Sequence, residues 1–203
     1  MKSKSNFMGW VFRMRFIKRW NRVDNQKSTD VDLHSHCLNV AVVSHLLAEV
    51  GNAYHGENYN AERISLLGLY HEFAEVVTGD SPPIKYASEG ITQEVKRLED
   101  QAESMCVQAL PEKLQAKMAT FIIQKDISKE EKALVKAADD IVALSKAKEE
   151  VTMASNFDFT NALDNLQGKV NTHADNIPAV KTYLSLFKEG YSETIDHLMN
   201  SGH

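Results

Sequence analysis

The stretch YHEFAEVVTGDSPP, residues 70–83, decides the fold, because it ends an apolar helix in a cluster of polar side chains. The apolar part precedes it as ISLLGL, residues 64–69, and His71 and Glu72 stand side by side near the end of that helix. Glu75 follows at i+4 from His71, so a continuing helix would place all three side chains on roughly one face. The Thr-Gly-Asp turn and two prolines then end the helix. Polar groups beside apolar neighbours must face water or bind something, and we interpret these as half of a metal site.

The composition is that of an ordinary globular protein and excludes several classes. The 203 residues suffice for one domain, which we predict to span residues 1–203. Hydrophobic residues make up 43% and charged residues 25% of the chain, as in typical soluble proteins. The net charge of −5 offers no basic surface, so we expect no nucleic-acid partner. Cys37 and Cys106 lack CxxC spacing and are expected to be reduced thiols.

The sequence also argues against a membrane partner. No segment reaches the roughly 18 consecutive apolar residues of a membrane span. The apolar part of the N-terminus is interrupted by Arg13, Arg15, Lys18 and Arg19, whereas a signal peptide needs an uninterrupted apolar core. We therefore expect a cytoplasmic protein.

The N-terminal segment FMGWVFRMRFIKRW, residues 7–20, is predicted to be a helix that docks at the edge of the core. Its apolar stripe consists of Phe7, Trp10, Val11, Met14 and Ile17. At its end, Arg19 and Trp20 place a cation beside an aromatic ring where a polar loop begins. That pair suits the binding of an anion together with a flat or sugar-like group.

The rest of the chain also predicts helices, and no alternating run of β-branched residues predicts a strand. Asn60 is expected to cap one helix and Ser128 to open another with a capping box, while Gly51-Asn52 should stop an earlier one. We expect a loop over residues 21–32. We expect helices over residues 33–50, from 60 through 72 and on to the Thr-Gly-Asp turn at 78–80, and over residues 91–110, 111–124, 128–150, 157–170 and 173–199. The predicted fold class is all-α, with about seven to nine helices.

Several polar residues have the types needed to hydrolyse a phosphate ester. That reaction needs a nucleophilic water at neutral pH and positive charge near the phosphoryl oxygens, and a transition metal held by imidazoles and carboxylates supplies both. The candidates are His36, the adjacent His71 and Glu72, and Asp139. Asp139 interrupts the apolar run of residues 134–144, where a carboxylate is costly to bury unless it is paired or bound to a metal.

The order of these pieces resembles that of the HD-domain metal phosphohydrolases, a family named for its His…His-Asp…Asp ligand set, and more closely that of their bacterial 5′-deoxynucleotidase branch. The matching motifs cover the chain from about residue 12 to residue 150, and the residues beyond carry no matching motif. They are IKRWN (17–21), HCLNVA (36–41), NAERI (60–64), YHEFAEVVTGD (70–80) with Pro82 and IKY (84–86), and EEKALVKAAD (130–139). The resemblance implies an all-α HD-domain bundle.

By position, the resemblance implies that His36, His71, Glu72 and Asp139 bind a divalent transition metal of the Co²⁺, Mn²⁺ or Zn²⁺ class. Glu75 would be the catalytic acid/base that orients the attacking water or protonates the leaving oxygen.

The resemblance also implies a set of substrate-binding residues. Arg19 would orient the phosphate, and Trp20 would pack on the sugar and discriminate against a 2′-hydroxyl. The turn of residues 80–83 would contact the side of the sugar that carries its hydroxyl group. The full expected set is Arg19, Trp20, Asp80, Ser81, Pro82, Pro83 and Lys85.

The sequence departs from the family pattern at two places. Glu72 stands where the family name requires aspartate, and its extra methylene can shift the ion or change its coordination. The first histidine motif reads His34-Ser35-His36, where the family usually has an acidic residue before the histidine. We assign His36 as the ligand because residues 38–41 continue the family pattern, while His34 competes for the role.

The expected function is metal-dependent hydrolysis of deoxyribonucleoside 5′-monophosphates to deoxynucleoside and phosphate. One alternative is a deoxynucleoside triphosphate triphosphohydrolase, for which Arg13, Arg15, Arg22 and Lys85 would supply further cations. A second is a catalytically impaired, nucleotide-binding scaffold, which Glu72 motivates. The resemblance further implies a homodimer or a larger homo-oligomer. Base preference and native metal stay open.

Overall fold

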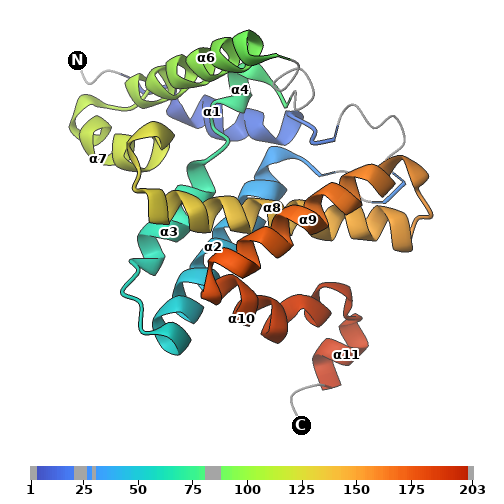
Figure 1. The fold of residues 1–203 in the computed structure, drawn as a ribbon. Helices are drawn as coiled ribbons and strands as arrows, with labels where there is room; N and C mark the ends of the chain where they lie inside the picture. The colour runs from blue at the N-terminus through green and yellow to red at the C-terminus, as the bar shows by residue number, and fades with distance from the viewer. Residues whose placement is uncertain (1–3, 21–26, 29–30, 81–87, 201–203) are drawn as a thin grey trace.

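The described part of the protein is all-α (Figure 1). The computed structural model describes residues 4–20, 27–28, 31–80 and 88–200, and these contain no strand, only an isolated bridge between Lys18 and Asp32. Nine of the described α-helices have six residues or more, which confirms the predicted fold class. They are α1 (Phe7–Arg13), α2 (Leu33–His55), α3 (Ala61–Tyr70), α6 (Glu89–Gln108), α7 (Glu112–Ile122), α8 (Lys129–Thr152), α9 (Thr160–Asn176), α10 (Pro178–Phe187) and α11 (Ile195–Asn200). The shorter elements are α4 (Glu75–Thr78) and the 3₁₀ turns η1 (Met14–Phe16), η2 (Gln124–Asp126), η3 (Phe157–Phe159) and η4 (Lys188–Ser192).

Side-chain caps begin the helices that matter for the site. The Asp32 carboxylate accepts from the Ser35 amide at the start of α2, and Asn60 accepts from the Arg63 amide at the start of α3. Ser128 and Glu131 form a reciprocal capping box at the start of α8. The predicted caps at Asn60 and Ser128 are confirmed, because each satisfies backbone donors that the first helical turn leaves unpaired.

The predicted end of α2 at Gly51 is wrong. The helix runs on to His55 and ends at Gly56, whose φ of 70° is the left-handed conformation that favours glycine. Gly51 does not end the helix; its lack of a side chain lets the ring of Tyr59 pack closely against it. A Cβ there would lie 2.6 Å from Cε2 of Tyr59, whose ring folds back over the helix.

The predicted helices at the two chain ends are also too long. The N-terminal helix changes to the 3₁₀ turn η1 after Arg13 and does not reach Trp20. Near the C-terminus, the predicted break before residue 173 is absent, and α9 continues to Asn176. The single helix predicted over residues 173–199 is wrong, because this range is divided among the end of α9, α10, η4 and α11. Pro178 then starts α10 as its first residue, a position where the missing amide proton costs no hydrogen bond.

Helix α2 is central to the main core and packs against α3, α8 and α10. A second apolar cluster joins α1, η1, α6 and α7 to the first turns of α2, and it contains the predicted N-terminal stripe. A third, smaller cluster lies near the C-terminal end of α8 and contains Ala147, Phe159 and Leu166, with Trp20 packed against it. Among the described helices, none is long and apolar enough to cross a membrane.

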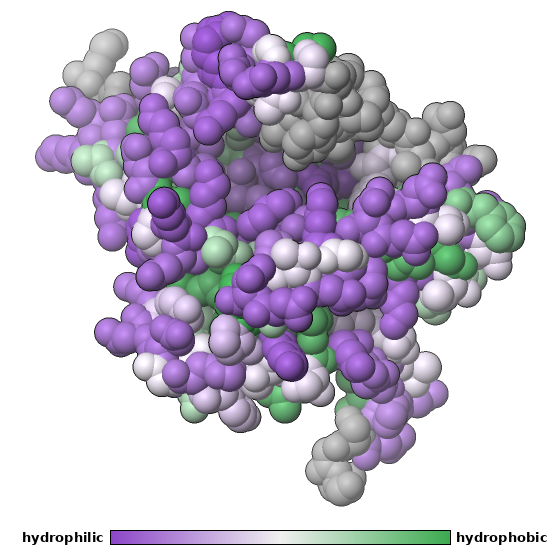
Figure 2. All heavy atoms as spheres, viewed as in Figure 1, coloured by the Kyte–Doolittle hydropathy of each residue, from purple (hydrophilic) through white to green (hydrophobic). Residues whose placement is uncertain are grey.

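The arrangement leaves a pocket between α6 and α8. In Figure 1, α8 and α9 run side by side across the middle of the molecule, and α6 lies apart from them at the top of the view. Figure 2 shows the surface hollowed and hydrophilic between α6 and α8. The pocket has a volume of about 950 Å³, and its lining also includes Arg19, Trp20 and the turn between α3 and α4.

Candidate metal centre and substrate pocket

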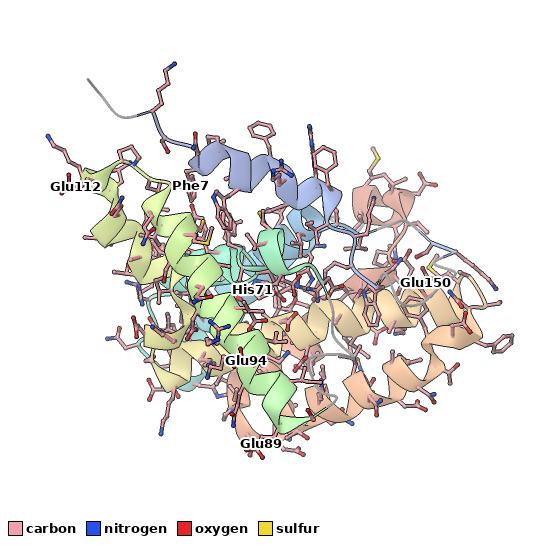
Figure 3. The ribbon with its side chains drawn as sticks, turned by 90° about the horizontal axis from the view of Figure 1, so that it is seen from above. Phe7, His71, Glu89, Glu94, Glu112 and Glu150 are labelled. Carbon is pink, nitrogen blue, oxygen red and sulfur yellow. The ribbon has the colours of Figure 1, made fainter. Side chains whose placement is uncertain are left out.

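The four side chains predicted as metal ligands come together beside the pocket, and three of them, His71, Glu72 and Asp139, line it. His36 comes from α2, His71 and Glu72 from the turn after α3, and Asp139 from α8. One ligand atom from each of the four lies within 4.8 Å of all the others. Figure 3 shows His71 deep in the molecule, below α6 and next to α8.

The spacing of these atoms fits a shared cation. Nε2 of His36 lies 3.2 Å and Nε2 of His71 lies 3.9 Å from Oδ1 of Asp139. These three atoms are buried, and their geometry gives none of them a hydrogen-bond partner among the described residues. Buried polar atoms are normally paired, so three that converge without partners fit a divalent metal ion.

The backbone that carries His71 and Glu72 is not the predicted helix. Helix α3 ends at Tyr70, residues 71–74 form turns, and Glu75 opens the short helix α4. The break has a packing reason, because Phe73 is buried in the second apolar cluster and contacts Phe7. The turns let Phe73 pack below α1 while the polar side chains face the pocket.

The hydrogen bonds of His71 set its tautomer. Its Nδ1 lies 2.7 Å from the carbonyl oxygen of Gly68, which can only accept, so Nδ1 carries the proton. In the neutral form that would bind a metal, Nε2 would present its lone pair toward Asp139 and Glu72, whereas without an ion these carboxylates favour the imidazolium. Burial opposes the imidazolium form of His71, but the carboxylates of Glu72 and Asp139 raise its pKa well above the usual value. Burial lowers the pKa of His36.

Asp139 is held from its other side by a cation. Its Oδ2 accepts from Nζ of Lys136 at 2.7 Å, and the same Nζ donates to Asp140 at 2.9 Å. Asp140 in turn contacts Nε2 of His173 on α9 at 2.9 Å. Although burial favours the neutral acid, His36, His71 and Lys136 hold the pKa of Asp139 well below its usual range. Asp139 is therefore an ionised carboxylate with Oδ1 directed at the ligand cluster.

Arg19 lies against two of the pocket carboxylates. Its Nη1 contacts Oε1 of Glu72 at 3.1 Å and Oε2 of Glu75 at 3.4 Å. Burial alone would lower the pKa of Arg19, but these carboxylates and Asp80 raise it. Burial, followed by the charge of Glu72, raises the pKa of Glu75 to about 10, so its carboxyl is protonated at neutral pH.

Trp20 and Asp80 meet at the pocket edge. The backbone amide of Trp20 donates to Oδ2 of Asp80 at 3.1 Å, and both residues line the pocket. Trp20 has a φ of 61°, a left-handed conformation that non-glycine residues rarely adopt. The other predicted substrate-binding residues, Ser81, Pro82, Pro83 and Lys85, lie outside the described residues, as does Arg22.

His34 does not join the cluster. Its Nε2 lies within hydrogen-bonding distance of the carbonyl oxygen of Val11, so the ring is turned toward α1. His36, two residues later, lies on the side of α2 that faces Asp139. The geometry therefore favours His36 over His34 as the histidine of the first motif.

One wall of the pocket was not predicted from sequence. Val95, Leu98 and Met105 of α6 line it, together with Gln101 from the same helix. Lys132 and Lys169 line the opposite side, from α8 and α9. The helical spacing of the α6 residues indicates an apolar face, but it does not say that the face borders a pocket.

Comparisons with known proteins give the family of the chain. The family model described as 5′-deoxynucleotidase YfbR-like matches residues 6–191. The chain belongs to this family. Membership confirms the resemblance drawn from the sequence motifs and the expected class, a hydrolase of the 5′-deoxynucleotidase type.

Individual relatives cover almost the whole chain. A 5′-deoxynucleotidase of Photobacterium profundum is 36% identical over 196 residues, which cover 96% of this chain and 98% of that protein. A 5′-deoxynucleotidase of Yersinia pseudotuberculosis is 36% identical over 195 residues, which cover 96% of each chain. Among solved structures, an HD-domain phosphohydrolase from Listeria innocua aligns with a TM-score of 0.78 at 15% identity, covering 92% of this chain and 88% of that one. That likeness shows the HD-domain fold.

Proposed function

We propose that the protein hydrolyses deoxyribonucleoside 5′-monophosphates to deoxynucleoside and inorganic phosphate. The observation that carries the proposal is a cluster of three converging ligand atoms without hydrogen-bond partners. Two of them belong to residues that line a pocket together with the half-buried Arg19 and the ring of Trp20. The groups that we propose for binding metal, phosphate and sugar thus lie in or beside one cavity. Its volume of about 950 Å³ is in the range of small-molecule sites. The names of the relatives support the same substrate class.

His36, His71, Glu72 and Asp139 would hold a divalent ion of the Co²⁺, Mn²⁺ or Zn²⁺ class. When bound, such an ion supplies positive charge at the phosphoryl oxygens and acidifies water. Two imidazoles with two carboxylates suit late first-row ions better than magnesium.

The remaining pocket residues bind and protonate the substrate. The Arg19 guanidinium, directed at the ligand cluster, binds a phosphoryl oxygen. The oxygen of a water molecule forms a bond to phosphorus while the bond between phosphorus and the 5′ oxygen breaks. The protonated carboxyl of Glu75 donates its proton to the 5′ oxygen, and its carboxylate then takes the proton that the water loses. Trp20 packs on the sugar, and the apolar wall of α6 takes the base by contact, without a fixed set of hydrogen bonds.

A product assay tests the proposal directly. The purified protein is incubated with dAMP, dUMP or AMP in the presence of Co²⁺ or Mn²⁺, and phosphate release is measured. We expect release from the deoxy substrates and much less from AMP. No release from any deoxyribonucleoside monophosphate with either metal would refute the activity. Tight binding of the nucleotide without turnover would instead support the catalytically impaired, nucleotide-binding scaffold.

One observation favours a second candidate, a deoxynucleoside triphosphate triphosphohydrolase. Lys132 and Lys169 line the same pocket and would neutralise further phosphate groups. Arg13 and Arg15, two of the cations expected to bind the additional phosphates, lie outside the pocket. The guanidinium of Arg15 lies 4.7 Å from the ring centroid of Phe16. Incubation with dATP decides between the candidates, because one releases inorganic triphosphate and the other does not.

The expected homodimer and cytoplasmic location stay predictions. Exposed apolar side chains on α1 and η1, namely Met8, Phe12 and Phe16, offer a surface that a second copy of this chain would cover. Sedimentation analysis of the protein and of a Phe12→Ser, Phe16→Ser variant tests this, since loss of the dimer in the variant is the expected result.

A further inference from the structure

The segment that carries Arg19 and Trp20 is closed at its base. The Arg19 amide donates to the carbonyl of Val31 at 2.8 Å, and the Leu33 amide donates to the carbonyl of Ile17 at 3.1 Å. Trp20 follows directly after these paired residues. The position of its ring therefore depends on the contacts that Trp20 itself makes.

The Trp20 ring rests on Phe159. The two ring centroids are 5.0 Å apart, and the rings are tilted by 46°. Phe159 belongs to η3, is fully buried and is backed by Ala147 and Leu166. Trp20 lines the pocket and Phe159 does not, so Phe159 acts on a ligand only through Trp20.

A buried carboxylate ties Lys27 and Ser28, which follow Trp20 in the chain, to η3. Glu150 has no exposed surface and accepts from the amides of Lys27 and Ser28 at 3.0 and 3.1 Å. It also accepts from Asn156, which caps η3, at 2.8 Å, and from Lys146 at 2.8 Å. Glu150 therefore joins Lys27 and Ser28 to the turn that presents Phe159, and Figure 3 shows it toward the C-terminal end of α8.

The backbone at Trp20 is itself under constraint. A left-handed φ at a bulky residue persists only where the surroundings over-determine it. Asp80 holds the amide and Phe159 supports the ring, so the two contacts fix one side chain from two elements.

We propose that Phe159, anchored through Glu150, is a positioning residue that fixes the Trp20 ring and thereby sets the selectivity for deoxyribose over ribose. The proposal rests on the function proposed above, in which Trp20 packs on the sugar. A ring that excludes a 2′-hydroxyl must not recede when the larger sugar presses on it. Phe159 closes the space into which the ring would move.

The test compares Phe159→Ala with Phe159→Leu, which keeps most of the volume. kcat and KM are measured for dAMP and AMP below the unfolding temperature of each variant. We expect Phe159→Ala to lower the deoxy-to-ribo ratio of kcat/KM by about tenfold, the size of one apolar contact in discrimination. Trp20→Ala should also lower the deoxy-to-ribo ratio of kcat/KM. Phe159→Leu should keep this ratio closer to the wild-type value than Phe159→Ala does.

Fluorescence gives a readout that does not depend on turnover. The chain has two tryptophans, so a Trp10→Phe background leaves Trp20 as the reporter. Phe159→Ala should shift the emission of Trp20 to longer wavelength, and Glu150→Gln should do so to a smaller extent. The matched control is Phe121→Ala, a buried phenylalanine of α7 that does not line the pocket. Phe121→Ala should lower the free energy of unfolding but leave the Trp20 emission wavelength and the deoxy-to-ribo ratio of kcat/KM unchanged.

The outcomes separate the two proposals. If the wild-type protein hydrolyses no monophosphate, the proposed function fails, while a shifted emission in Phe159→Ala still supports the positioning of the ring. If a folded Phe159→Ala keeps the wild-type ratio, or changes it no more than Phe121→Ala does, the positioning role in selectivity is overturned. An unchanged Trp20 emission overturns it as well.

Discussion

At the scale of single residues, the ligand cluster depends on charge at Asp139. Its Oδ1 faces two imidazoles, and its Oδ2 is bound to Lys136, so the side chain is already oriented toward the ion site. A carboxylate in this position costs desolvation energy that its partners must offset. Its neighbours therefore explain why an acid stands in the apolar run of α8.

Asp139→Asn should abolish metal binding and leave the fold intact. The amide keeps the volume and loses the charge, so we expect Co²⁺ affinity to fall by at least about 100-fold. Isothermal titration with Co²⁺ measures the affinity, and circular dichroism of the metal-free protein reports the fold. Asp164→Asn, an exposed acid of α9, is the control. Retained stoichiometric binding in Asp139→Asn would remove Asp139 from the ligand set.

Glu75→Gln should separate catalysis from metal binding. Glu75 is buried, carries a raised pKa of about 10 and contacts Arg19, and it is not part of the four-residue ligand cluster. Its amide cannot donate a proton to a leaving group, so kcat should fall by about 10²–10⁴-fold. Metal content after purification should match the wild type. A variant that loses its metal together with its activity would show that Glu75 acts as a ligand.

At the scale of elements, the turn after α3 shows both the reach and the limit of the sequence motifs. His71, Glu72 and Glu75 were expected around one site, and the structure gathers them in one pocket. The backbone was predicted wrongly as a continuous helix face, because the local pattern does not reveal that Phe73 must reach the cluster beneath α1. Residue type indicated the chemistry, and long-range packing determined the backbone.

Gly68→Ala should destabilise the protein and disturb the site. A Cβ at Gly68 would lie 2.9 Å from Oγ of Ser44 and 3.2 Å from both Cα of Ala41 and the carbonyl oxygen of Val40, so α2 and α3 would have to separate. Overpacking of this kind costs about 1–3 kcal/mol. Because the Gly68 carbonyl accepts from His71, metal affinity should fall as well. Urea unfolding and Co²⁺ titration measure the two effects.

The chain contains a matched control for this change. Gly168 lies inside α9, and a Cβ there would meet nothing within 4 Å. Gly168→Ala should therefore stabilise the protein by about 0.5–1 kcal/mol through helix propensity alone. Equal effects of the two substitutions would mean that the close approach of α2 and α3 at Gly68 carries no energetic weight.

At the scale of the whole molecule, the sequence predicted the parts that have local signals. Caps, the amphipathic first helix and the ordered motifs predicted an all-α fold and a site drawn from three helical regions. Phe159 and Glu150 had no such signal, because their roles depend on contacts with residues more than a hundred positions away. The apolar wall of α6 was missed for the same reason, since only the tertiary arrangement sets it opposite α8.

The stability of the whole molecule should depend on pH through Glu103, a residue far from the ligand cluster in sequence. Glu103 is a buried carboxyl of α6, 6% exposed, that accepts from the amide of Gln124. Burial, which favours the neutral acid, raises its pKa from 4.5 to about 7 in spite of that hydrogen bond. In the unfolded chain it would titrate near its ordinary value of about 4.3.

The sign of the effect follows from proton binding. Between about pH 4.5 and 7 the folded protein keeps a proton on Glu103 that the unfolded chain has lost. The stability contributed by this group is thus fully present below the unfolded pKa and is lost as pH rises through the folded pKa. Glu103→Gln cannot ionise and keeps an acceptor for the Gln124 amide. Relative to the wild type, it should therefore gain about 1–3 kcal/mol between pH 5 and pH 8, allowing for solvent screening.

Urea unfolding of both proteins at pH 5 and pH 8, each stripped of metal with a chelator, measures this difference without a contribution from metal binding. The difference in unfolding free energy should be small at pH 5 and should favour Glu103→Gln at pH 8. Glu99→Gln, an acid of the same helix whose position faces the pocket, should show no such trend if the effect comes from burial. A wild-type protein that instead becomes more stable than Glu103→Gln as pH rises would mean that the ionised Glu103 is stabilised by its surroundings, and that α6 packs on α7 through a charge.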